Sequence, residues 1–233
     1  MKRKWAKRLL NLPYTAYLTS MVSAESFRID GIKRLIRPNR KPLKNFTDIV
    51  AKELDDAGVS HEDADIFFQD EAAFGLMNEP KRCWVKGERP IVPCQTIREC
   101  TYAYAAVNPF NGDMVSLILP YTNTLVMNVF LEEVSLRQAD RFTLMFLYQA
   151  GWHTAKDLNV PPNIRLAYMP AYSPELNPTE HIWDELREKY FHNLAFDGIA
   201  AVEDALVVGI QNLEKDARKV QSMTGFNWIV TIV

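Results

Sequence analysis

The chain has 233 residues, of which 48% are hydrophobic and 24% are charged. These ordinary globular values exclude a disordered chain. No apolar run approaches the roughly 18 residues that cross a bilayer, which excludes an integral membrane protein. The three cysteines (Cys83, Cys94 and Cys100) form no CxxC pair. Neither a disulfide framework nor a cysteine zinc site is therefore expected, and a reducing, cytoplasmic setting fits best.

The net charge of −2 hides an asymmetry along the chain. Residues 1–45 contain 12 Lys and Arg against 2 Asp and Glu, a net charge of +10. Residues 46–233 contain the other 15 Lys and Arg against 27 Asp and Glu, a net charge of −12. A basic arm on an acidic body suggests that the arm meets a polyanion. A solvated surface extension explains the charge equally well.

The first elements in chain order are helical. Apolar residues recur at helical spacing from about residue 24 to 37 among four basic side chains, and Pro38 ends this basic helix. Residues 37–44 read as an extended basic linker. A second helix is expected at 45–57, ending at Gly58. We therefore divide the chain into a basic arm and linker, 1–45, and one larger domain, 46–233.

The larger domain alternates strands with helices, which predicts an α/β sheet with helices packed on it. A hairpin is expected around the turn at 108–112, and the nearly continuous apolar run at 142–148 is typical of a central strand covered on both faces. The expected strands are 64–69, 74–77, 83–85, 101–107, 113–119, 142–148 and 164–169. The expected helices are 123–135, 178–192 and 198–215.

Two carboxylates are candidates for chemistry. Asp70 directly follows the strand at 64–69, and open α/β sheets bind ligands at strand ends, although a lone Asp there also serves as a turn or cap residue. Glu180 lies in the first turn of the helix at 178–192, so its carboxylate can point back toward the strand ends. The alternative is that Glu180 only complements the helix dipole.

Four sequence blocks together resemble the mariner-like DDE transposases of bacterial insertion sequences. They are Phe67-Phe-Gln-Asp-Glu-Ala-Ala-Phe-Gly75, Trp84-Val-Lys-Gly-Glu-Arg-Pro90, Ala150-Gly-Trp-His153 and Pro170-Ala-Tyr-Ser-Pro-Glu-Leu-Asn-Pro-Thr-Glu-His-Ile-Trp183. The resemblance runs from about 64 to 228. It implies an RNase H-like fold, in which a mixed five-stranded sheet is flanked by helices. It also implies cleavage and transfer of DNA strands with two divalent ions, Mg²⁺ or Mn²⁺.

The resemblance assigns metal-binding, catalytic roles to Asp70 and Glu180. In the family a second Asp lies two residues before the Ala of the Ala-Gly-Trp-His block, and here that position is Tyr148. A tyrosine has a pKa of about 10, so at neutral pH it offers a neutral phenol, which is a poor Mg²⁺ ligand. Glu71 and His153 are candidates for residues that bind no metal themselves but orient the metal ligands. For His153, an ordinary hydrogen bond within its loop is an equally good interpretation.

Double-stranded DNA, as element ends and target, is the implied partner, with a homodimer left open and no small-molecule substrate. The family carries N-terminal helix-turn-helix domains, and about 45 residues are too few for the usual pair, so the arm reads as a truncated remnant. Basic residues of the arm and of the body are the expected backbone contacts. They are Lys33, Arg34, Arg37, Arg40, Lys41, Lys81, Arg82, Lys86 and Arg89.

Three hypotheses remain open at this point. The leading one is a transposase catalytic domain whose metal site is broken at Tyr148. The second is a catalytically dead DNA-binding or multimerisation remnant. The third is an active RNase H-like nuclease that uses only Asp70 and Glu180, with or without Glu71.

Overall fold

The computed structural model describes residues 45–78, 80–81, 86–87, 91–171 and 173–231. The expected basic helix and linker, and the strand piece expected at 83–85, therefore lie outside the described residues. The described residues belong to one compact unit. No helix in these described ranges is both long enough and apolar enough to cross a membrane.

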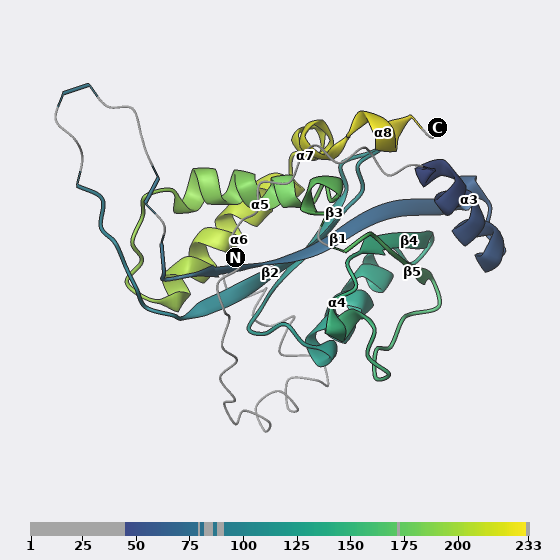
Figure 1. Ribbon diagram of the computed structural model, residues 1–233, viewed down its shortest axis with the longest axis horizontal. Helices are drawn as coiled ribbons and strands as arrows, with labels where there is room; N and C mark the ends of the chain where they lie inside the picture. The colour runs from purple at the N-terminus through teal and green to yellow at the C-terminus, as the bar shows by residue number, and fades with distance from the viewer. Residues whose placement is uncertain (1–44, 79, 82–85, 88–90, 172, 232–233) are drawn as a thin grey trace. The chain divides into compact units, whose positions relative to one another are not determined.

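Five strands form one mixed sheet (Figure 1). Their order is β3-β2-β1-β4-β5, where β1 pairs antiparallel with β2 and parallel with β4. The two outer strands keep the direction of pairing on their own side of the sheet. On one side β3 pairs antiparallel with β2, and on the other β5 pairs parallel with β4. The expectation of a mixed five-stranded sheet is thereby confirmed. The strands are β1 Ala64–Gly75, β2 Cys100–Val107, β3 Met114–Leu119, β4 Phe142–Leu147 and β5 Ile164–Tyr168.

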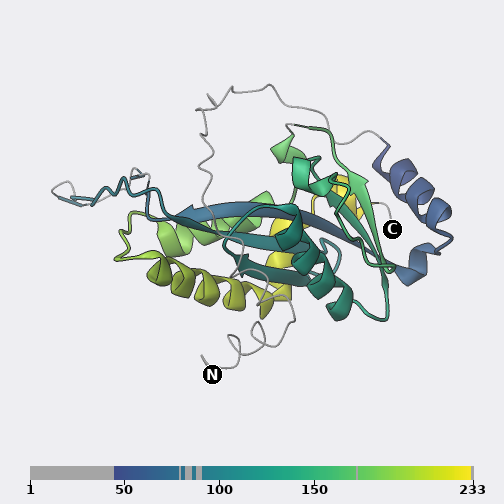
Figure 2. The ribbon, with the colours of Figure 1, turned by 90° about the horizontal axis from the view of Figure 1, so that it is seen from below.

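Helices cover both faces of the sheet. One apolar cluster joins the sheet to α3, α5, α6, α7 and α8, and a second cluster joins its other face to α4. Figures 1 and 2 both place α3 at the end of the sheet opposite the described parts of the segment between β1 and β2. The helices are α3 Phe46–Ala57, α4 Thr124–Arg137, α5 Glu180–Leu186, α6 Ile199–Glu214, α7 Ala217–Thr224 and α8 Asn227–Val230.

Three expectations about the elements were wrong in detail. The strand expected to end at 69 continues to Gly75, because its second half pairs with β2 from Phe68 onward. The helix expected at 178–192 is α5 followed by a π-helical turn at Arg187–Phe191. The short helices α7 and α8 were not expected, since eight and four residues carry little periodic signal.

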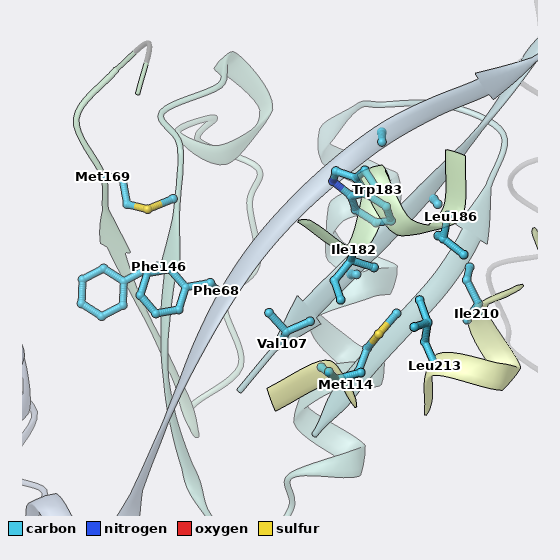
Figure 3. Packing of buried hydrophobic residues seen from close by; sticks show 14 of the residues in the cluster. Phe68, Val107, Met114, Phe146, Met169, Ile182, Trp183, Leu186, Ile210 and Leu213 are labelled. Carbon is cyan, nitrogen blue, oxygen red and sulfur yellow. The ribbon is translucent and has the colours of Figure 1, made fainter. Parts of the chain in front are cut away.

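Aromatic side chains fill the core between β1, β4 and the helices of one face. The rings of Phe68 and Phe146 stack with centroids 5.3 Å apart, on neighbouring parallel strands. Phe46 of α3 packs on Phe146 at 5.0 Å, and Trp228 of α8 meets Phe46 edge-on at 5.1 Å. Figure 3 shows Phe68 and Phe146 together, next to Met169. This packing fixes β4 against β1, and so fixes the positions of the polar residues on and just after the two strands.

Phe146→Ala should lower the free energy of unfolding by about 3–5 kcal/mol, because it removes a fully buried ring and leaves a cavity. Phe146 is 1% exposed. Chemical denaturation measures the loss. Leu136→Ala is the matched control, since Leu136 is 62% exposed and its truncation should cost little. Equal losses in the two variants would contradict the assigned core.

Candidate functional site

Asp70 lies inside β1, where it pairs with Ala105 of β2. Because side chains alternate between the faces of a strand, Asp70 lies on the same face as Phe68, which belongs to the cluster under α5 and α6. Sequence analysis placed Asp70 just past the end of a strand, and its position within β1 corrects that. Backbone pairing on the β2 side therefore holds the residue rigidly.

Two side chains before α5 attach the start of that helix to β1. Nδ2 of Asn177 donates to the carbonyl oxygen of Gln69 at 3.0 Å, and Oγ1 of Thr179 donates to that of Phe68 at 2.8 Å. Both side chains are buried. Buried polar groups that find their partners specify one arrangement strongly. These two bonds hold Glu180, the first residue of α5, against the middle of β1.

Trp183 of α5 completes the contact with Asp70. Its Nε1–H donates to Oδ2 of Asp70 at 3.0 Å, and its ring is 1% exposed. Figure 3 shows Trp183 beside Leu186 on α5. Trp183 is three residues after Glu180, so both side chains lie on one side of the helix. The indole therefore fixes Asp70 from the same helix that carries the second carboxylate.

The electrostatics of this pair favour a proton on Asp70. Burial of the carboxyl group raises its pKa well above the ordinary value, and the nearby Glu180 and Glu71 raise it further. The hydrogen bond from Trp183 acts in the opposite direction but does not outweigh them. Like charges close together in a poorly solvated place are costly. A cation between Asp70 and Glu180 would relieve that cost, which is what a metal site does.

Tyr148 lies at the third position of the site. The register of β4 on β1 ends at Phe68 opposite Phe146, and two further residues place Tyr148 beside Asp70. Its hydroxyl group donates to the backbone carbonyl of Ser173 at 2.6 Å. The structure thus brings together the three positions that the sequence singled out, with a phenol at the third.

The phenol of Tyr148 stays protonated. Burial raises its pKa, and the charges of Asp70, Glu180 and Glu175 raise it further. The proton is also engaged, because a carbonyl oxygen can only accept. Tyr148 therefore closes the site with a neutral donor bound to Ser173, where an Asp would offer two anionic oxygens.

The side chain of Glu71 lies on the face of β1 opposite that of Asp70. Its Oε1 accepts from Nε1 of Trp152 at 3.0 Å, and its Oε2 accepts from Nε2 of Gln69 at 2.9 Å. His153 lies behind it, with Nε2 3.6 Å from Oε2 of Glu71, and is 2% exposed. This placement argues against Glu71 as a ligand shared with Asp70, so a nuclease would have to use Asp70 and Glu180 alone. His153 makes a hydrogen bond within its own loop, from Nδ1 to the carbonyl oxygen of Tyr148 at 2.6 Å.

The donor set fits two divalent ions poorly. The described ranges contain no group of three His, Cys, Asp or Glu side chains placed to hold a metal ion. Asp70 and Glu180 offer carboxylate oxygens, which Mg²⁺ prefers, but the third position offers a phenol. Two carboxylates suit a single, weakly held cation better than a bridged pair.

Most of the basic residues singled out for DNA lie outside the described residues. Of those described, Lys86 is exposed, and Nζ of Lys81 is 3.9 Å from the Glu188 carboxylate. The backbone of Lys81 is held by the side chain of Asn193, which accepts at Oδ1 and donates from Nδ2. The sequence-based DNA contacts that remain outside the described residues are Lys33, Arg34, Arg37, Arg40, Lys41, Arg82 and Arg89.

The residues that hold the site together were not predicted from the sequence. Asn177, Thr179 and Trp183 belong to the last of the four sequence blocks, but no role in the site was expected for them. One signal was available, since Trp183 is spaced three residues from Glu180 on a helix. Nothing local indicates that Thr179 bonds a strand 111 residues away.

Asp70→Asn should stabilise the fold at neutral pH. Because the folded state raises the pKa of Asp70, it binds this proton more tightly than the unfolded chain. Ionising Asp70 therefore costs stability as the pH rises above its ordinary pKa of about 4. The variant should have a higher Tm than the parent at pH 7.5, and the gain should vanish near pH 4.

Thermal unfolding across this pH range measures the difference, and the amide oxygen of the variant can still accept from Trp183. Asp204→Asn is the control, because Asp204 is exposed on α6 and should show no such pH-dependent gain. A lower Tm for Asp70→Asn at pH 7.5 would contradict the assigned burial.

Comparisons with known proteins agree with this geometry. A family model described as DDE superfamily endonuclease matches residues 65–202, more than half of the chain, and the match includes all three site positions. "Uncharacterized protein y4pE/y4sA" of Sinorhizobium fredii (strain NBRC 101917 / NGR234) is 40% identical over 96 residues, covering 41% of this chain and 71% of that protein.

Solved structures show the same fold at low sequence identity. One is the Mos1 transposase paired-end complex with left transposon end, with a TM-score of 0.50 and 18% identity, covering 97% of this chain and 74% of that one. Another is the Mos1 mariner paired end complex with Mn, with a TM-score of 0.50 and 15% identity, covering 91% and 70%. The fold is thus RNase H-like, as in the Mos1 catalytic domain. By the family match, the chain belongs to the DDE superfamily endonucleases.

Proposed function

We propose that the chain is the catalytic-fold domain of a bacterial insertion-sequence transposase that binds double-stranded DNA in the cytoplasm. Its own strand cleavage is disabled at Tyr148. The observation that carries this proposal is the hydrogen bond from the Tyr148 hydroxyl to the Ser173 carbonyl at the position of the second carboxylate. The function is therefore one of DNA binding on a transposase scaffold, with Asp70 and Glu180 retained.

The loss of cleavage follows from the charge of the site. Two-metal enzymes place ions about 3.5–4 Å apart, one at the attacking oxygen and one at the leaving oxygen. Anionic ligands must offset the repulsion between these ions. With a neutral phenol at position 148, the site has one ligand and one negative charge fewer than a site built from three carboxylates. Cleavage by the unmodified chain should be undetectable or very weak.

DNA binding is supported by charge and by the family. Residues 1–45 have a net charge of +10, and neutralised phosphates release counterions, which drives association. The solved Mos1 complex that shares the fold contains a transposon end. Of the expected body contacts, Lys81 and Lys86 are exposed and can reach a DNA backbone, although Nζ of Lys81 also lies 3.9 Å from the Glu188 carboxylate.

Tyr148→Asp should raise the metal affinity of the site above that of the parent. The variant restores a third carboxylate beside Asp70 and removes the phenol hydrogen bond to Ser173. We expect a lower Tm without metal, a rise in Tm with Mn²⁺, and Mn²⁺ affinity at least about tenfold above the parent's. Calorimetric titration and cleavage of linear DNA are the measurements.

Tyr148→Asp combined with Glu180→Ala is the control and should lose both metal binding and any cleavage. Tyr148→Phe separates the hydrogen bond from the charge, and it should bind no more metal than the parent. Robust nicking by the parent, unchanged in Tyr148→Phe, would show that another residue supplies the ligand.

Replacing Lys33, Arg34, Arg37, Arg40 and Lys41 by Gln should weaken non-specific DNA binding and flatten its salt dependence. Each lost phosphate contact lowers the slope of log affinity against log salt by about 0.9. Binding to a random duplex across a salt series measures the slope. Lys-to-Gln changes at exposed body positions that are not expected contacts, such as Lys52 and Lys156, are the charge-matched control. An unchanged slope in the arm variant would show that the arm is not the contact.

A further inference from the structure

A buried cluster on the face of β1 opposite Asp70 is not used by the proposed chemistry. It consists of Glu71, Trp152 and His153. Glu71 accepts the indole N–H of Trp152 at 3.0 Å and lies 3.6 Å from Nε2 of His153. The exposed fraction of the Glu71 side chain is 11%, and that of His153 is 2%. A carboxylate so placed holds the loop after β4 to the middle strand of the sheet.

The imidazole of His153 reaches back to the site. Its Nδ1 is 2.6 Å from the backbone carbonyl oxygen of Tyr148. A carbonyl oxygen only accepts, so Nδ1 carries the proton. Nε2 is buried 3.6 Å from Oε2 of Glu71 and makes no hydrogen bond within the part of the chain that the structure describes. The turn is closed by backbone bonds from Ala150 to Tyr148 and from His153 to Ala150. Tyr168 at the end of β5 adds a hydroxyl donor to the His153 carbonyl at 2.9 Å.

The main chain leaves the sheet at residue 148. The pairing of β4 with β1 ends at Phe146, but its pairing with β5 reaches Leu147, whose carbonyl oxygen accepts from the N–H of Met169 at 2.9 Å. The carbonyl of Tyr148 is the first one beyond these strand pairs. What holds this carbonyl is the His153 imidazole together with the turn. The direction of that peptide sets where the side chain of residue 148 points, and its neighbour across the sheet is Asp70.

We propose that Glu71 is a positioning residue. Its hydrogen bond with Trp152 holds the turn at 150–153, in which Nδ1 of His153 bonds the carbonyl oxygen of Tyr148, and so Glu71 sets the placement of the residue-148 side chain near Asp70. The inference rests on the proposed function only where it treats position 148 as a ligand position. Asp70 and Glu71 are consecutive on β1 but have separate roles. Asp70 belongs to the candidate site, and Glu71 orients the main chain just past the end of β4.

The first test needs no metal and uses the full chain. In ¹⁵N-histidine NMR, His153 should show an Nδ1-protonated ring with a slowly exchanging, downfield N–H signal, assigned by its loss in His153→Gln. Glu71→Ala should abolish this slow exchange. Glu71→Gln should keep it, because an amide can still accept from Trp152 and donate to Nε2 of His153. Retention of the signal in Glu71→Ala would overturn the proposal.

Asp65→Ala is the matched control. Asp65 is also on β1, on the same face as Glu71, and pairs with Arg141 at 2.7 Å at the other end of the strand. Its loss should lower Tm without changing the His153 signal. If Asp65→Ala and Glu71→Ala abolish the signal alike, the effect is general loosening and the proposal fails.

The second test adds Tyr148→Asp to each variant and measures Mn²⁺ affinity. Glu71→Ala should weaken it about 10- to 100-fold, the range for residues that orient metal ligands, while Glu71→Gln and Asp65→Ala should stay within about threefold. Equal affinity in the Glu71→Ala and parent backgrounds would overturn the proposal. If Tyr148→Asp alone binds no Mn²⁺, the proposed function fails, and the His153 signal still decides the role of Glu71.

Discussion

The candidate site depends first on the alternation of side chains along β1. Asp70 and Glu71 are consecutive, so one lies under α5 and α6 and the other on the α4 face. Each accepts an indole N–H, from Trp183 and Trp152 respectively. These indoles come from α5 and from the loop after β4. The central strand β1 therefore binds both of these segments through hydrogen bonds to its two carboxyl groups.

Tyr148 changes the chemistry of the site without disturbing this scaffold. Its hydroxyl group finds a good acceptor in the Ser173 carbonyl, and burial with nearby carboxylates keeps it protonated. Burial, together with the charges of Glu180 and Glu71, raises the pKa of Asp70. The fold therefore tolerates the phenol well, while a bridged pair of metal ions loses an essential ligand.

The sequence predicted the sheet, and the roles of Asp70, Tyr148 and Glu180 stay predictions. The contacts around these residues came only from the structure. The hairpin and the apolar run before Tyr148 carry strong local signals, and the sequence blocks identify Asp70 and Glu180. Polar residues at 70 and 71 suggested a strand end, but pairing with β2 overrides that signal. The bond from Trp183 to Asp70 joins residues 113 apart, which no local pattern encodes. The basic arm stays a prediction.

A crystal structure of the unmodified chain in millimolar Mn²⁺ tests the central claim most directly, because anomalous scattering locates each ion. We predict at most one ion, between Asp70 and Glu180, with the Tyr148 hydroxyl still bonded to the Ser173 carbonyl. Two ions bridged by Asp70, with Tyr148 turned away or bound to metal, would contradict the account.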